Sequence, residues 1–205
     1  LLIEIGRPQE ALARARAALA FDLSQNQESP LDIALSQRSV ARALAALDDR
    51  QEASRLFDES LERLRRSSRR DHLAPGLLDR ARFLLEDDPA QAARDIEAAL
   101  AIASPRGFRL VEGDAYLTQA RLEVSRGDVA AAEISLERAR SLLIETGFEL
   151  RVPTMLITAA LIYSRTGNPG LALQTIQEAG DKVRRMEMHG LDSEIARAQA
   201  MIECK

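Results

Sequence analysis

Several residue types are scarce in this sequence of 205 residues, and each shortage narrows what the chain can be. It holds a single cysteine, Cys204, so it forms no internal disulfide, and we expect a reducing, cytoplasmic compartment. Aromatic residues make up 3% and tryptophan is absent, so the interior must depend on leucine, isoleucine and alanine, which suits close helix packing. No run of about 18 apolar residues occurs, so no transmembrane helix is predicted, and no signal-peptide pattern begins the chain.

An excess of positive charge is also missing. The 28 lysines and arginines stand against 32 aspartates and glutamates, giving a formal net charge of −4. Nucleic-acid binding depends on neutralising phosphates, and a helical repeat that reads RNA needs basic residues and a side-chain code in each repeat. We therefore expect that this chain binds neither nucleic acid nor an anionic membrane surface.

Motifs that carry catalysis are absent as well. His72 and His189 lie far apart in the sequence, and neither has a partner at a metal-ligand spacing such as His-x-x-x-His. There is no Gly-x-x-x-x-Gly-Lys-[Ser/Thr] phosphate loop and no Gly-x-Ser-x-Gly elbow. The acidic residues 86–88 precede Pro89, where helix capping accounts for them. The sequence thus predicts a protein that is not an enzyme and that has no metal and no cofactor.

What the sequence does contain is a figure repeated five times: a small residue, a larger one four positions later and a small one seven positions later. These positions share one face of a helix, where small side chains let a neighbouring helix approach closely. The copies begin at Ala11, Ala53, Ala92, Ala132 and Ala172, which are 42, 39, 40 and 40 residues apart. A fixed period in this range predicts an array of helical repeats.

The pattern resembles the tetratricopeptide repeat, a helix–turn–helix unit whose usual length is about 34 residues. Here the surplus falls between copies, as in residues 139–153. Such long repeats are similar to the arrays of the maltose-regulator type, which occur in large bacterial signalling ATPases and transcription regulators. The resemblance implies an all-α fold, an α-α superhelix or right-handed solenoid of antiparallel helix pairs, in which the first helix of each pair lines the concave surface.

We predict one solenoid over residues 1–205. Because it begins at Leu1 rather than Met, and neither end offers a polar capping repeat, we expect it to be a piece of a longer protein. The expected repeats are 1–28 (incomplete), 30–70, 71–104, 107–147 and 150–187, with a terminal helix at 191–203.

Local signals refine three connections in this array. Gly107 and Gly147, each followed by phenylalanine, predict left-handed helix caps with an apolar residue packing back on the helix, and Gly190 predicts a third copy. Pro75 and Gly76 predict a short or delayed start for a helix over 73–86.

Carried over by register, the resemblance places nine side chains on the concave face: Arg38, Arg42, Arg82, Asp114, Thr118, Arg121, Ser125, Thr158 and Arg165. They do not reproduce the Lys/Asn clamp with which chaperone-binding members hold a terminal carboxylate. Arginines there favour a partner with carboxylates. The alternative interpretation is that these residues are only the solvated faces of amphipathic helices.

Two functions remain open. The first is a noncatalytic interaction or sensor module of a larger bacterial signalling or transcription regulator, which binds a protein or peptide segment in the concave groove. The second is a structural scaffold in which apolar stripes at open solenoid ends pair copies of the chain into homo-oligomers.

Overall fold

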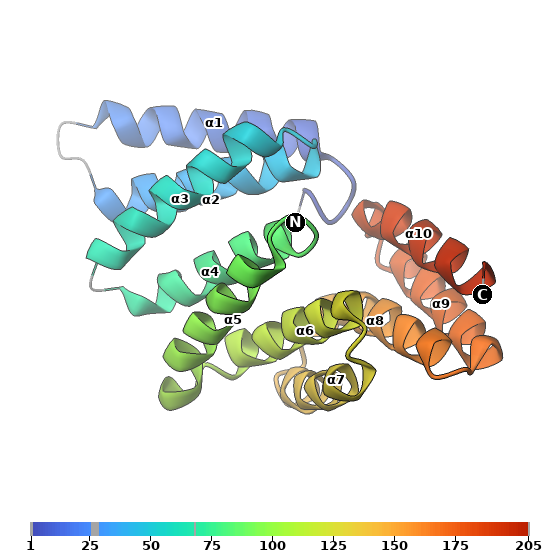
Figure 1. The fold of residues 1–205 in the computed structure, drawn as a ribbon. Coiled ribbons are helices and arrows are strands. Elements are labelled where there is room, and N and C mark those ends of the chain that lie inside the picture. Colours follow the sequence, from blue (N-terminus) through green and yellow to red (C-terminus); the bar gives the residue numbers. More distant parts are fainter. Residues whose placement is uncertain (1, 26–28, 68, 205) are drawn as a thin grey trace.

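In the computed structural model, which describes residues 2–25, 29–67 and 69–204, these ranges form ten α-helices and three short 3₁₀ turns without any strand (Figure 1). The helices are α1 (Pro8–Ser24), α2 (Pro30–Ala46), α3 (Arg50–Arg66), α4 (Arg70–Leu84), α5 (Pro89–Ala103), α6 (Arg109–Arg126), α7 (Val129–Glu145), α8 (Val152–Arg165), α9 (Pro169–Arg185) and α10 (Asp192–Glu203). Residues 1, 26–28, 68 and 205 belong to predicted repeats or to the predicted solenoid but lie outside the described residues. None of the helices in the described ranges combines the length and apolar content needed to cross a bilayer.

The helices pack as consecutive hairpins, which confirms the predicted fold class. Helix α2 pairs with α3, α4 with α5, α6 with α7, and α8 with α9. The first helices of successive hairpins also contact one another in a row that runs from α2 through α4, α6 and α8 to α10. The result is an all-α helical-repeat superhelix whose inner wall is this row (Figure 1).

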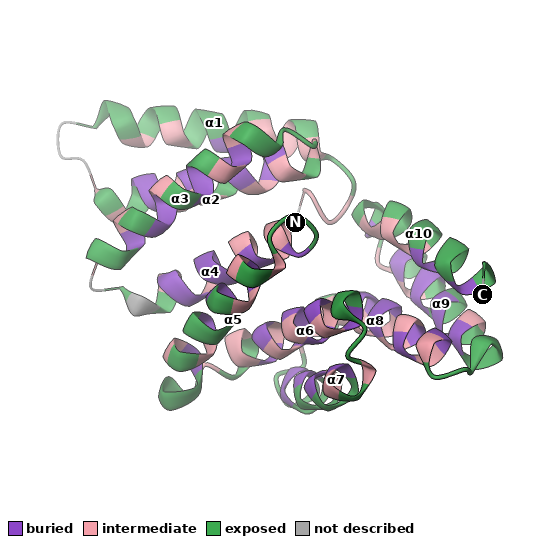
Figure 2. Cartoon of the chain, viewed as in Figure 1, coloured by how far each residue is buried: buried purple, intermediate pink, exposed green. Residues whose placement is uncertain are grey.

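The repeated small–large–small face is the packing surface of the later hairpins. The alanines that begin these copies have no exposed surface: Ala53, Ala92, Ala132 and Ala172. Figure 2 shows the buried positions on the faces that helices turn toward one another. The first copy differs, because Ala11 is only partly buried and Ala18 is exposed.

Two of the three predicted glycine caps are confirmed. Gly107 and Gly147 have φ values of 66° and 64°, in the left-handed region that glycine adopts without strain. The prediction for Gly190 is wrong: its φ is not positive, and Glu187 takes the left-handed conformation with φ 54°. Glu187 lies one 40-residue period after Gly147, so the period, rather than the residue type, sets the position of this turn.

The predicted delay at the start of the third repeat is also wrong, since α4 begins at Arg70. Pro75 lies inside the helix, where it removes one backbone hydrogen bond near the first turn. The close approach of α3 fits this geometry, because a Cβ at Gly76 would lie 3.1 Å from Leu61 and from Leu64. Packing against α3 therefore outweighs the local preference of a Pro-Gly pair for a turn.

The superhelix closes on itself. The backbone N–H of Gly190 donates a hydrogen bond of 2.9 Å to the carbonyl of Glu4. A Cβ at Gly6 would lie 3.2 Å from the Cβ of His189, so the two turns are in direct contact. The N-terminal turn, residues 2–6, thus packs on the turn that precedes α10 (Figure 1). This contact joins the first and last units and bounds the concave side of the molecule.

Candidate binding surface on the concave side

A central cavity of about 530 Å³ lies on the concave side. Its walls come mainly from the inner helices α2, α4, α6, α8 and α10, while α3 adds Arg50 and Phe57 and the N-terminal turn adds Ile3 and Glu4. Five of the predicted concave residues line it: Arg42, Arg82, Asp114, Thr118 and Arg121. The helical spacing of these residues brings them together because inner helices from successive repeats present equivalent faces to the same space.

A smaller hollow, the apolar pocket, adjoins this cavity and has a volume of about 180 Å³. Its apolar wall consists of Leu85, Val124, Ile157, Leu161, Ala198 and Met201. Three further predicted residues lie around it: Ser125, Thr158 and Arg165. The cavity and the pocket share five lining residues: Leu85, Glu86, Arg121, Glu194 and Arg197. We therefore treat the two hollows as one continuous concave groove.

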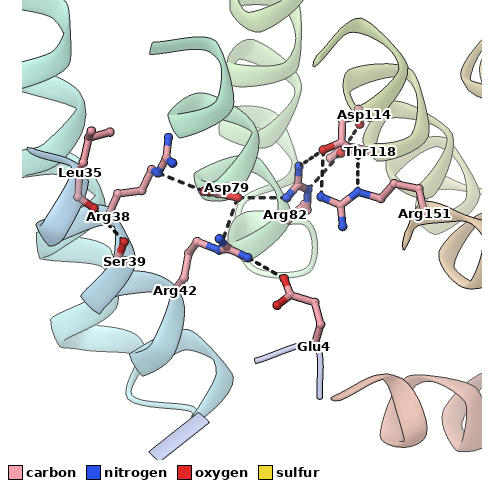
Figure 3. A network of polar contacts seen from close by, with 10 residues as sticks. All are labelled: Glu4, Leu35, Arg38, Ser39, Arg42, Asp79, Arg82, Asp114, Thr118 and Arg151. Atoms are coloured by element: carbon pink, nitrogen blue, oxygen red, sulfur yellow. Dashed lines mark hydrogen bonds and ion pairs between the residues drawn. The ribbon is translucent and has the colours of Figure 1, made fainter. Parts of the chain in front are cut away.

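Ion pairs form a network along the wall of the central cavity, with Asp79 at one centre (Figure 3). Arg82 Nη1 donates to Asp79 Oδ1 at 3.0 Å. Arg38 Nε lies 3.5 Å from Asp79 Oδ2, and Arg42 Nε lies 3.7 Å from Asp79 Oδ1. Arg38, which does not line either hollow, is thus tied to the groove through Asp79. One carboxylate joins α2 to α4 across the repeat boundary.

Asp114 is the second centre of the network. Arg82 Nη2 donates to Asp114 Oδ2 at 3.0 Å, and Arg151 Nη2 donates to the same oxygen at 2.9 Å (Figure 3). Burial alone raises the pKa of Asp114, but the charge of Arg82 and the hydrogen bonds from Arg151 outweigh it and hold the pKa below its ordinary value. Asp114 is therefore an ionised carboxylate that joins α4, α6 and the turn before α8.

The N-terminal turn supplies the third carboxylate. Arg42 Nη2 donates to Glu4 Oε1 at 2.9 Å. With Glu4 included, the inner network contains four guanidiniums and three carboxylates: Arg38, Arg42, Arg82, Arg151, Glu4, Asp79 and Asp114. The network therefore carries one more positive than negative charge.

The remaining arginines of the groove differ in how they are paired. Arg121 Nη2 donates to Glu194 Oε1 at 2.7 Å, across the groove from α6 to α10. Arg197 Nη1 lies 3.7 Å from a carboxylate oxygen in the turn after α4. Arg165 has no carboxylate partner among the residues that the structure describes, and its only hydrogen bond is a long one of 3.4 Å from Nη1 to the Leu161 carbonyl. Arg165 is thus the exception among the predicted concave arginines.

The predicted hydroxyl groups have a more limited part. Thr118 Oγ1 donates to the Asp114 carbonyl, and Thr158 Oγ1 donates to the Thr154 carbonyl, both at 2.8 Å. Both side chains are buried. They form part of the wall, but each hydroxyl already donates its hydrogen bond to a carbonyl of its own helix. Ser125 Oγ likewise donates to a backbone carbonyl, although this residue is exposed.

Several groove residues were absent from the sequence-based prediction. Asp79 has a signal that could have revealed it, since it lies about one repeat period after Arg38 and on the same helix face as Arg82. Glu4 and Glu194 have no such signal. Glu194 lies 73 residues from Arg121, and only the closure of the superhelix brings the two together. The arginines expected to await an acidic partner are mostly paired with carboxylates of this chain.

Comparison with known proteins adds no identification. No protein-family model matches the chain, and no curated protein matches it either. Within the described ranges, no group of three or more His, Cys, Asp or Glu side chains is arranged to hold a metal ion.

Proposed function

We propose that this chain is a noncatalytic interaction module that binds a protein or peptide segment in its concave groove. The observation that carries the proposal is the continuity of the groove, in which a charged cavity opens directly onto an apolar pocket through shared walls. A partner segment could bury apolar side chains at one end and place polar groups at the other. Helical-repeat superhelices use extended concave surfaces in this way.

The resemblance to long tetratricopeptide arrays supports a wider context for the same proposal. In that context the module belongs to a larger bacterial signalling or transcription regulator, where it binds a protein or a segment of one in the cytoplasm. Neither nucleic acid nor a membrane is part of this proposal, because the central cavity is lined by six guanidiniums and six carboxylates, a balance that favours neither phosphates nor anionic lipids.

The alternative is a scaffold that assembles end to end. Phe21 is 65% exposed and Leu23 is 51% exposed near the end of α1, which offers an apolar surface for a second copy. The contact of Glu4 with Gly190 argues against this alternative, because through it the N-terminal turn already packs on the turn before α10. Light scattering as a function of concentration tests the choice: a constant monomer mass is expected, and a mass that grows with concentration and falls in Phe21→Ser favours the scaffold.

The binding proposal is tested by filling the groove. Met201 is 49% exposed and lines the apolar pocket, so Met201→Trp should block the pocket without disturbing the core. The matched control is Ile134→Trp, because Ile134 is 59% exposed and lies on α7, outside both hollows.

Displayed random peptides are selected against the wild-type chain, and their affinities are then measured for both variants. We expect binders that lose at least about tenfold in affinity with Met201→Trp, about 1.4 kcal/mol, and that are unaffected by Ile134→Trp. Failure to select any binder, or binders that tolerate both changes equally, would show that the groove is not the binding surface.

A further inference from the structure

Arg165 and the apolar pocket together point to a ligand of specific chemistry. If the proposed function is right, we infer that the partner segment places an aliphatic side chain in the apolar pocket and pairs a nearby carboxylate with Arg165. Three features support this chemistry: the size of the pocket, its charge balance, and the guanidinium of Arg165, which pairs with no carboxylate among the described residues.

The size of the pocket limits what can enter it. Pockets for drug-sized ligands usually have volumes of about 300–1,000 Å³. The apolar pocket, at about 180 Å³, is smaller and is suited to a single side chain of a peptide. Leu161, Ile157 and Val124 form an aliphatic wall, while Met201 adds a flexible side chain that can adapt to the shape of a guest. An aliphatic side chain such as that of leucine is the guest that this lining favours.

The charge balance selects the group next to that side chain. Three guanidiniums line the pocket, those of Arg121, Arg165 and Arg197, against the two carboxylates of Glu86 and Glu194. Arg121 and Arg197 are each paired with one of these carboxylates. The surplus positive charge is therefore that of Arg165, at the edge of the pocket formed by the end of α8.

Among the described residues no carboxylate pairs with Arg165, and this gives the incoming carboxylate its position. A guanidinium presents five N–H donors in a planar fork that matches a carboxylate. Arg165 uses one of them in a long bond to a carbonyl of its own helix, and the side chain is only partly buried. Arg82, by contrast, already contacts two carboxylates. An incoming carboxylate can pair with Arg165 without displacing any carboxylate of this chain.

The test uses two libraries of nine-residue peptides with blocked ends, so that no terminal carboxylate is present. Each peptide carries a central leucine and one glutamate within four positions of it, and the matched library carries glutamine in place of glutamate. Binding is measured by fluorescence polarisation with the wild-type chain, with Arg165→Gln and with Arg140→Gln. Arg140 is exposed on α7, away from both hollows, and serves as the control.

We expect the glutamate library to contain peptides that bind the wild-type chain about tenfold more tightly than their glutamine counterparts, about 1.4 kcal/mol. The preference should disappear in Arg165→Gln, remain in Arg140→Gln and weaken as salt is raised. A glutamate preference that persists in Arg165→Gln would overturn the assignment to Arg165.

The remaining outcomes separate this inference from the proposed function. Equal binding of both libraries to the wild-type chain would refute the carboxylate requirement while leaving the groove as a binding surface. If neither library binds, although random selection yields peptides that Met201→Trp blocks, the inferred chemistry is wrong and the proposed function stands. If neither the libraries nor the selection give binders, both are wrong.

Discussion

Two arginines on α4 form ion pairs with different roles on the two sides of a repeat. Arg80 and Arg82 are two residues apart, so their side chains leave the helix about 200° apart. Arg80 turns outward to Asp95 of α5, with Nε–Oδ2 and Nη2–Oδ1 both at 2.7 Å. Arg82 turns inward to Asp79 and Asp114. One pair lies within a hairpin, and the other borders a cavity.

The degree of burial separates these two sites. The Arg80 and Asp95 side chains are 11% and 3% exposed, whereas Arg82 and Asp114 are 24% and 15% exposed. This bidentate pair fixes how α4 lies on α5, because both side chains are largely shielded from water. Arg80 also pairs with Asp58 of α3, and Asp95 also accepts a hydrogen bond from Gln91. The inner network borders the central cavity, and the Arg82–Asp114 pair in it is less shielded from water. This contrast predicts that breaking the Arg80–Asp95 pair lowers stability more than breaking an ion pair of the inner network.

The largest expected effect is that of Asp95→Ala. It leaves the guanidinium of Arg80 buried with only Asp58 as a partner, and breaking a buried pair costs about 3–5 kcal/mol. Urea denaturation measures the change in the free energy of unfolding. Asp58→Ala is the control, because Asp58 is 61% exposed and should contribute less than about 1 kcal/mol. Equal effects of the two substitutions would contradict the distinction between sealed and open pairs.

Asp114→Asn should have a smaller effect, of about 1–3 kcal/mol at neutral pH, since it weakens three charge-assisted hydrogen bonds in a partly open site. The folded-state pKa of Asp114 lies below its ordinary value, which is about 3.9 for aspartate in an unfolded chain. As the pH falls below that value, the unfolded state takes up the proton first. The contribution of Asp114 is therefore complete above about pH 5 and is lost as the pH falls through the folded pKa.

Urea denaturation at a series of pH values checks this sign. The difference between the wild-type chain and Asp114→Asn should be constant from neutral pH down to about pH 5 and then shrink. A difference that grows on acidification would show that Asp114 is not held ionised by Arg82 and Arg151.

Local sequence patterns suffice for much of this architecture. The period of about 40 residues and the alanine faces predict the hairpins, because each packing contact is made within or between adjacent repeats. The same helical spacing leads Arg42, Arg82 and Arg121 to the central cavity. Their participation in binding remains a prediction.

The contacts that could not be predicted from the sequence are those that depend on the curvature of the whole superhelix. Glu194 is paired with Arg121 only because small rotations at each repeat accumulate until the ends meet. The contact of Glu4 with Gly190 has the same origin. Pro75 illustrates a different limit, since its local preference for a helix boundary is overridden by the packing of α4 on α3.

The pair that spans the groove offers a measurement of this long-range coupling. Arg121 and Glu194 are 27% and 23% exposed, so the coupling energy between them should be about 1 kcal/mol, between those of sealed and solvated pairs. A double-mutant cycle with Arg121→Ala, Glu194→Ala and the double variant measures it. The exchanged pair Arg121→Glu with Glu194→Arg should recover much of the stability. A coupling energy near zero would indicate that α6 and α10 do not approach as closely in solution.

The smallest effect on global stability, and the most specific test of closure, is that of Gly190→Ala. A Cβ at this position would lie 2.2 Å from the Ile3 carbonyl oxygen, so the N-terminal turn must move away. Gly170→Ala is the matched control, because a Cβ there would have no neighbour within 4 Å.

We expect the free energy of unfolding to change by less than about 0.5 kcal/mol in either variant, since the contact involves one terminal turn. Hydrogen exchange of the backbone amide at residue 190, which is bonded to the Glu4 carbonyl, should accelerate at least about tenfold in Gly190→Ala and stay unchanged in Gly170→Ala. Unaltered exchange in both variants would mean that the two ends of the superhelix do not hold one another, and the concave groove would then be open at that side.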